Sequence, residues 1–167
     1  MAIKNPRPKF IIFLLGDRPM SDPGHGRPVD ALDKVCKSYK NCLKCTRMIH
    51  GDLCISEFIS YLLEFTNGEP VCGDQAGTCQ RALCECDAKF AREHAGQTEV
   101  FDIKYHKFYS TTWDPVNDDA ACQRGGGGVR DPQCCTPKDG TGPALLYNAV
   151  IKDCCSDGRV VNHGSLC

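Results

Sequence analysis

"DKVCKSYKNCLKC", residues 33–45, places three cysteines along a segment with the periodicity of a helix. The surrounding segment begins at Pro28 and carries Asp30 near its first turn, and both residue types are common at helix starts. One helical face collects the apolar side chains Leu32, Val35, Cys36, Tyr39, Cys42, Leu43 and Met48. We therefore predict a long helix with a buried cysteine face and the pair Tyr39-Lys40 at its centre.

Cysteine is far more frequent in this chain than in an ordinary protein. Fourteen of 167 residues are cysteine, and an even number fits complete pairing in an oxidising compartment. Zinc is the rival use, but CLKC (residues 42–45) and CEC (residues 84–86) lack the second cysteine or histidine pair of a zinc site. We expect a secreted protein without metal centre or cofactor, whose disulfide cysteines are Cys36, Cys42, Cys45, Cys54, Cys72, Cys79, Cys84, Cys86, Cys122, Cys134, Cys135, Cys154, Cys155 and Cys167.

Charge and hydropathy narrow the classes of partner. The formal net charge is −1 and the pI is about 6.5, so neither nucleic acid nor an anionic membrane surface is the expected partner. The longest apolar run, FIIFLL at residues 10–15, is too short for a transmembrane helix. It has the shape of a short signal peptide but lacks a small-residue cleavage site, so we interpret it as an N-terminal core segment of the mature protein.

Turn residues divide the chain around the first helix. Glycine and proline crowd residues 16–28, which indicates a loop. Residues 55–65, ISEFISYLLEF, have apolar i, i+3, i+4 spacing and predict a second helical piece, or a helix that runs into a strand. Asn67-Gly68 then predicts a tight two-residue hairpin, and Pro70 marks its second strand as an edge strand.

A second long helix is predicted from Thr78 to Gly96. Thr78 is suited to the N-cap and Gly96 to the end, and Cys79, Leu83, Cys86 and Phe90 share one face. Two long helices that each carry several cysteines on one side are best explained as antiparallel neighbours joined by disulfides. We expect them to form a compact platform.

Composition changes in the C-terminal third of the chain. Residues 98–123 are rich in aromatic side chains and predict an irregular strap around the platform. Four glycines at residues 125–128 follow, and beyond them come Cys134-Cys135, Cys154-Cys155 and the terminal Cys167. We therefore predict one domain at residues 1–123 and a small cysteine-rich module at residues 124–167.

Two motifs in this order resemble the secreted phospholipase A2 signature. The family joins a calcium loop to its catalytic helix by G-x-G-x-P-x-D-x-L-D-x-C-C-x-x-H-D-x-C, which is matched at Gly24, Gly26, Pro28, Asp30, Leu32, Asp33, Cys36 and Cys42. Its C-x6-C-x4-C-x-C-D spacing is matched at Cys72, Cys79, Cys84, Cys86 and Asp87. The resemblance covers residues 10–123 and implies a mainly α-helical, disulfide-rich fold: two antiparallel, disulfide-linked helices with a small β-wing.

The resemblance also implies a partial disulfide map. It pairs Cys42 with Cys86, Cys54 with Cys79, and Cys72 with Cys84. Three cysteines of the family pattern are replaced here, by Met20, Val35 and Glu93. Cys36 and Cys45 therefore need partners outside the pattern or among each other's neighbours, and the six C-terminal cysteines are the available pool.

The departures at the centre of the first helix bear on catalysis. The family mechanism needs a histidine base paired with an aspartate, and a calcium ion held by a carboxylate beside that base. The resemblance places Tyr39 at the base position, Lys40 at the calcium-carboxylate position and Asp87 as the surviving dyad carboxylate. Ser21 and Pro23 also replace glycines of the calcium loop. We therefore predict a pseudoenzyme in which the Tyr39 hydroxyl donates to Asp87 in a buried structural pair.

The functions that follow are binding functions. The double cysteines of the C-terminal module resemble the di-cysteine repeats of galaxins, and a catalytically degenerate phospholipase A2 domain resembles the otoconins. Both resemblances imply an extracellular matrix or biomineral-associated protein whose partner is a protein, a matrix or a mineral surface. A weak surface calcium site is offered by Asp114, Asn117, Asp118 and Asp119, although a solvated turn explains the same residues.

Two alternatives stay open. Lysine at position 40 resembles membrane-active, toxin-like homologues from venoms, but those are strongly basic whereas this chain has a net charge of −1. The other alternative is a module that binds a lipid or a receptor. The resemblance implies a channel for the acyl chain of a lipid, and Tyr39 would either plug this channel or leave it open.

Overall fold

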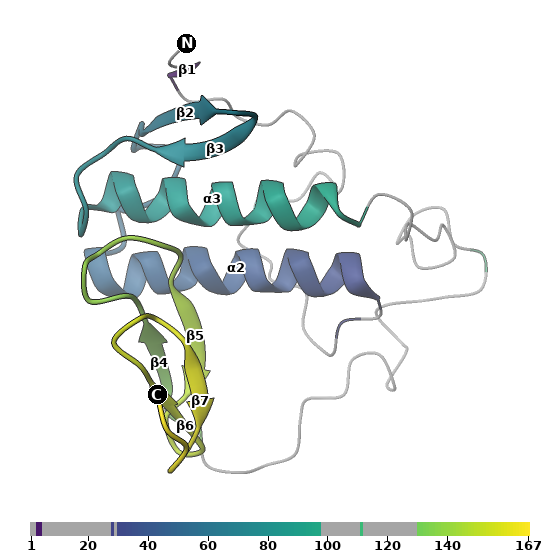
Figure 1. The fold of residues 1–167 in the computed structure, drawn as a ribbon, viewed down its shortest axis with the longest axis vertical. Coiled ribbons are helices and arrows are strands. Elements are labelled where there is room, and N and C mark those ends of the chain that lie inside the picture. The colour runs from purple at the N-terminus through teal and green to yellow at the C-terminus, as the bar shows by residue number, and fades with distance from the viewer. Residues whose placement is uncertain (1–2, 5–27, 29, 98–110, 112–129) are drawn as a thin grey trace.

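The computed structural model of the chain describes residues 3–4, 28, 30–97, 111 and 130–167. Two antiparallel helices run side by side at its centre (Figure 1). In chain order the elements are β1 (Ile3–Lys4), α2 (Ala31–His50), β2 (Leu62–Thr66), β3 (Glu69–Cys72), α3 (Cys79–Ala95), β4 (Pro132–Cys135), β5 (Leu145–Asn148), β6 (Lys152–Cys154) and β7 (Val160–Asn162). The predicted fold class, mainly helical and disulfide-rich with a small β-wing and a cysteine-rich C-terminal part, is confirmed.

Helix α2 begins and ends at recognisable caps. The Asp30 carboxylate accepts the Asp33 backbone N–H at 2.7 Å, and Gly51 closes the last turn with φ of 95°. The buried face consists of Val35, Tyr39, Cys42, Cys45 and Thr46. The helix predicted from the opening stretch is therefore confirmed, and Tyr39 lies on its inner face.

Helix α3 is the second half of the platform. Thr78 is its N-cap and Gly96 its C-cap, as predicted. Its inner face packs against α2 on one side and against the β-wing on the other, so the core has two parts. The first part contains Val35, Tyr39, Cys42, Cys45, Cys86, Phe90 and Ala144, and the second Cys54, Tyr61, Leu63, Cys72, Leu83, Cys84 and Ala88.

The β-wing confirms the predicted hairpin and corrects the predicted second helix. Asn67 and Gly68 both have positive φ, 53° and 84°, as the tight hairpin requires, and Pro70 lies on the edge strand β3 of the order β1-β2-β3. Residues 55–58 form turns rather than a helix, and the strand begins only at Leu62. The apolar spacing misled because Cys54 is tied to Cys79, and Tyr61 and Leu63 pack into the core from a strand end.

Six disulfides join the described residues. All three bridges implied by the resemblance are present: Cys42–Cys86, Cys54–Cys79 and Cys72–Cys84. Cys45 bonds Cys134, and the remaining bridges are Cys135–Cys154 and Cys155–Cys167. Within the described residues Cys36 has no disulfide partner, and Cys122 lies outside them.

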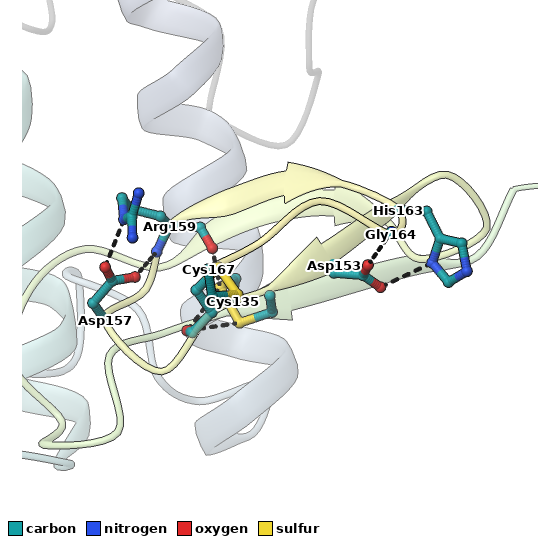
Figure 2. Close-up of a disulfide and its surroundings, with 9 residues drawn as sticks. Cys135, Asp153, Asp157, Arg159, His163, Gly164 and Cys167 are labelled. Carbon is teal, nitrogen blue, oxygen red and sulfur yellow. Dashed lines mark hydrogen bonds and ion pairs between the residues drawn. A yellow bond between two sulfur atoms is a disulfide. The ribbon is translucent and has the colours of Figure 1, made fainter.

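The C-terminal residues form two hairpins on the outer side of α2 (Figure 1). The Cys45–Cys134 bridge fixes β4 to the helix, and Leu146 of β5 packs against the first core cluster. Figure 2 shows the cysteines of this part around Cys135 and Cys167, with Asp157 and Arg159 beside them. The Asp153–His163 ion pair lies at the far end of the β6–β7 hairpin.

A glycine contact fastens the C-terminal part at a second point. The Gly77 backbone N–H donates to the Gly140 carbonyl at 3.1 Å. Gly140 has φ of 70°, and a Cβ there would lie 2.6 Å from the Gly77 nitrogen. The C-terminal part therefore bridges α2 and the turn that precedes α3.

Several predictions fall outside the described residues. They concern the apolar segment at 10–15, the loop at 16–27, the strap at 98–123 with its candidate calcium ligands, and the domain boundary at 123/124. Within the described residues, neither helix is long and apolar enough to cross a bilayer.

Candidate functional site

A carboxylate held between the two helices is the centre of the site. The Tyr39 hydroxyl, on α2, donates to Oδ1 of Asp87 on α3 at 2.6 Å. The Tyr61 hydroxyl, just before β2, donates to Oδ2 of the same carboxylate in a short hydrogen bond. The predicted pair of Tyr39 and Asp87 is therefore confirmed, and both carboxylate oxygens are engaged by phenols.

Both tyrosines are core residues. Tyr39 is 5% exposed and Tyr61 is 4% exposed. The Tyr39 ring lies on the Phe90 ring with centroids 4.7 Å apart, and Phe90 in turn packs on His94. The hydroxyl of Tyr39 is thus held on Asp87 by packing of its ring as well as by the hydrogen bond.

Burial and hydrogen bonding act in opposite directions on Asp87. Burial raises the pKa of its carboxyl above the ordinary value, while hydrogen bonds from Tyr39 and Tyr61 lower it, and the net direction is upward. The pKa values of both tyrosines are also raised, chiefly by burial and next by the nearby Asp87 charge. The two phenols are therefore protonated donors throughout the physiological range.

This arrangement bears directly on general base chemistry. A base must offer a lone pair to a water proton, but Tyr39 keeps its own proton and points it at Asp87. Asp87 accepts two hydrogen bonds from side chains instead of orienting an imidazole. Among the described histidines, His50, His94 and His163, none hydrogen-bonds to this carboxylate, and His163 lies at the far C-terminal hairpin.

The described residues at this site do not fit calcium. Calcium prefers carboxylate and carbonyl oxygens, whereas Lys40 presents an ammonium one residue after Tyr39. Within the part of the chain that the structure describes, no three acidic, cysteine or histidine side chains converge on a metal position.

Tyr61 is the site residue that sequence reasoning missed. Its segment was predicted to be helical or the start of a strand, and neither pattern marks one residue as a partner of Asp87. Tyr61 reaches the carboxylate because Cys54–Cys79 and Cys72–Cys84 tie the segments on both sides of it to α3. No local signal in the sequence points to that contact.

The fold and the site define a disulfide-stapled two-helix platform with a partly buried carboxylate between the helices. The family model "Phospholipase A2" matches residues 21–105, about half of the chain. "Acidic phospholipase A2 PLA-1" of Eristicophis macmahoni is 35% identical over 88 residues, which is 53% of this chain and 68% of that protein. The chain belongs to the phospholipase A2 family.

Other relatives support the same assignment, with a smaller share of their own length matched. "Acidic phospholipase A2 5" of Echis pyramidum leakeyi is 31% identical over 99 residues, 59% of this chain and 66% of that protein. "Basic phospholipase A2 beta-bungarotoxin A-AL4 chain" of Bungarus multicinctus is 41% identical over 64 residues, 38% of this chain and 45% of that protein. The chain thus spans about two thirds or less of these two relatives, and the family match ends before the C-terminal hairpins.

Proposed function

We propose that this chain is an extracellular, non-hydrolytic member of the phospholipase A2 family that acts by binding. The observation that carries the proposal is the saturation of Asp87 by the Tyr39 and Tyr61 hydroxyls. An extracellular location is supported by six disulfides among the described residues, a density that oxidising compartments favour.

The expected loss of rate is large. Removing a general base costs about 10²–10⁴-fold, and removing an oxyanion stabiliser about 10²–10³-fold. Tyr39 occupies the position of the general base, and Lys40 occupies the position of the carboxylate that would hold the oxyanion-stabilising calcium. Both losses therefore apply. Hydrolysis should therefore be undetectable beside that of an active relative.

An extracellular matrix or mineral surface is the partner that we propose first. Three exposed carboxylates of the C-terminal part, Asp139, Asp153 and Asp157, have pKa values lowered mainly by backbone N–H groups of Thr141, Gly164 and Arg159. They are ionised throughout the physiological range, which suits a surface that meets calcium ions of a mineral. The separate candidate ligands between residues 114 and 119 lie outside the described residues.

A venom-like membrane-active or receptor-binding role is the second candidate. The observation in its favour is the similarity to venom relatives, one of which carries the name bungarotoxin. The net charge of −1 speaks against binding to anionic membranes by charge alone. A protein receptor is therefore the better partner within this second role.

One set of assays separates the candidates. Liposome hydrolysis and dye leakage are measured with and without calcium, with an active family member as the positive control, and sedimentation with calcium carbonate crystals is measured alongside. We expect no hydrolysis in either condition and co-sedimentation with the mineral. Hydrolysis that a calcium chelator abolishes would overturn the pseudoenzyme proposal, and leakage without hydrolysis would favour the membrane-active role.

A matched variant makes the first assay sharper. Tyr39→Phe removes the hydroxyl and keeps the ring, so it cannot add a base. If hydrolysis by the wild-type chain were real and depended on this site, Tyr39→Phe would change it. Hydrolysis equal in both proteins would point to a contaminating enzyme.

A further inference from the structure

A cleft between α2 and the C-terminal strand β5 lies outside the site described above. Its volume is about 210 Å³, and its walls include Lys34, Lys37, Ser38, Asn41, Leu145 and Leu146. The four helical residues are spaced i, i+3, i+4 and i+7, so they share one face of α2. Because the family match ends at residue 105, this cleft needs a part of the chain beyond the family domain.

The helical wall offers positive charge and hydrogen-bond donors. Lys34 is exposed and makes no ion pair within the described residues, whereas Lys37 also interacts within the chain. Ser38 Oγ accepts a hydrogen bond from Lys89 Nζ at 3.1 Å, which leaves the Ser38 proton free to donate. None of the residues that line the cleft is acidic. The wall is therefore suited to an anionic group.

The opposite wall is apolar and held in place. Leu145 and Leu146 pair with Cys135 and Cys134 in the β4–β5 ladder. Cys134 is bonded to Cys45 of α2, so a disulfide fixes the spacing of the two walls. Because the walls are already fixed, the protein loses less conformational entropy when a ligand binds.

We propose that this cleft binds a small anionic amphiphile, a carboxylate or phosphate monoester joined to a short hydrocarbon chain. The charged head pairs with Lys34 and receives hydrogen bonds from Ser38 and Asn41, and the hydrocarbon lies on Leu145 and Leu146. The volume of the cleft is below the roughly 300–1,000 Å³ of sites for drug-sized ligands. We therefore expect the hydrocarbon chain of the ligand to be short. This proposal is independent of whether the Asp87 site has lost hydrolysis.

Binding is tested on the full chain with its disulfides intact. The ¹⁵N-labelled protein is titrated with octanoate or octyl phosphate, each below its critical micelle concentration. The backbone amide signals of Ser38, Leu145 and Leu146 are followed by NMR. Octanol, acetate and inorganic phosphate are the comparison ligands. We expect saturable shifts with both amphiphiles and at least about tenfold weaker binding of the other three, since each lacks either the charge or the hydrocarbon.

Matched double variants locate the charge. Lys34→Gln/Lys37→Gln should weaken octanoate binding about tenfold or more. Lys44→Gln/Arg47→Gln removes the same charge from the other half of α2, outside the cleft, and should leave binding unchanged. The circular dichroism of both variants verifies the fold.

Four outcomes would contradict the proposal. Failure of both amphiphiles to bind, or an equal loss in the two double variants, would exclude a charged site in the cleft. Inorganic phosphate that binds as tightly as octyl phosphate would make it a simple anion site, and octanol that binds as tightly as octanoate would make it an apolar one. Preference for octyl phosphate over octanoate, or the reverse, assigns the head group within the proposal.

Discussion

The Tyr39 hydroxyl donates to Asp87 at 2.6 Å across the α2–α3 interface, so a phenol takes the contact that the resemblance gives to the catalytic histidine. The contact links the helices beside the Cys42–Cys86 bridge. The contact therefore contributes to the packing of the two helices. Its contribution to stability can be measured directly.

We expect Tyr39→Phe to destabilise the fold. The substitution leaves one oxygen of a partly buried carboxylate without its donor, and a hydrogen bond to a charged group contributes about 1.5–3 kcal/mol to the free energy of unfolding. Tyr147→Phe, on β5 and away from Asp87, is the control and should change that free energy by less than about 0.5 kcal/mol. Urea unfolding under non-reducing conditions measures both. Equal effects of the two variants would show that the hydrogen bond contributes nothing.

The loss of stability at alkaline pH should depend on the same site. The pKa values of Tyr39 and Tyr61 are raised in the folded state above the value of about 10 for a tyrosine in the unfolded chain. The contribution of the two protonated tyrosines to the free energy of unfolding is therefore complete below about pH 10 and is lost as the pH rises above it. Two of the five tyrosines should therefore ionise only together with unfolding, which the ultraviolet absorbance of tyrosinate detects. In Tyr39→Phe one late-ionising tyrosine should remain. Full ionisation of all five tyrosines before unfolding would contradict the buried donor pair.

The backbone contact between Gly140 and Gly77 should not tolerate a side chain. Gly140→Ala combines a left-handed backbone, which costs about 1–2 kcal/mol, with a Cβ placed 2.6 Å from the Gly77 nitrogen. Gly164→Ala is the matched control, because Gly164 has φ of 79° and open space around it. We expect the Gly140 variant to lose more stability and to lose protection of the Gly77 amide in hydrogen exchange. Equal losses would mean that the close approach is unimportant.

The Cys45–Cys134 bridge should hold the C-terminal hairpins on α2. Cys45→Ala/Cys134→Ala should lower the free energy of unfolding by up to about 4 kcal/mol, because the bridge closes a long loop. Cys155→Ala/Cys167→Ala opens a loop with a sequence separation of only 12 and should cost less, about 3 kcal/mol at most. Hydrogen exchange of the β4–β5 amides distinguishes the two double variants, because only the first should speed their exchange. Unchanged exchange in the first variant would show that packing alone docks the hairpins.

Cysteine pairing gives a last prediction. The six bridges among the described residues use twelve of the fourteen cysteines, which leaves Cys36 and Cys122. Since the even number indicates complete pairing, we expect a Cys36–Cys122 bridge. Mass spectrometry of a non-reduced digest should find the two peptides joined and no thiol open to alkylation. Alkylation of Cys36 in the native protein would show that it is a free thiol.

Local patterns in the sequence predicted the elements of the platform. Asp30 and Thr78 start the helices and Asn67-Gly68 makes the hairpin, because capping and positive φ depend only on neighbouring residues. Three disulfides and the Tyr39–Asp87 pair followed from a motif spacing shared with a known family. The turns at residues 55–58 were mistaken for a helix, since apolar spacing does not tell which long-range bridge overrides it.

The sequence by itself determined that this chain forms a disulfide-stapled helical platform with Tyr39 and Lys40 at its centre. The tertiary structure decided that Tyr61 also binds Asp87, that Cys45 bonds Cys134, and that Gly140 rests on Gly77. It also formed the cleft between α2 and β5. These features join segments far apart in the chain, and such contacts depend on how the elements pack in three dimensions, which no short stretch of sequence specifies.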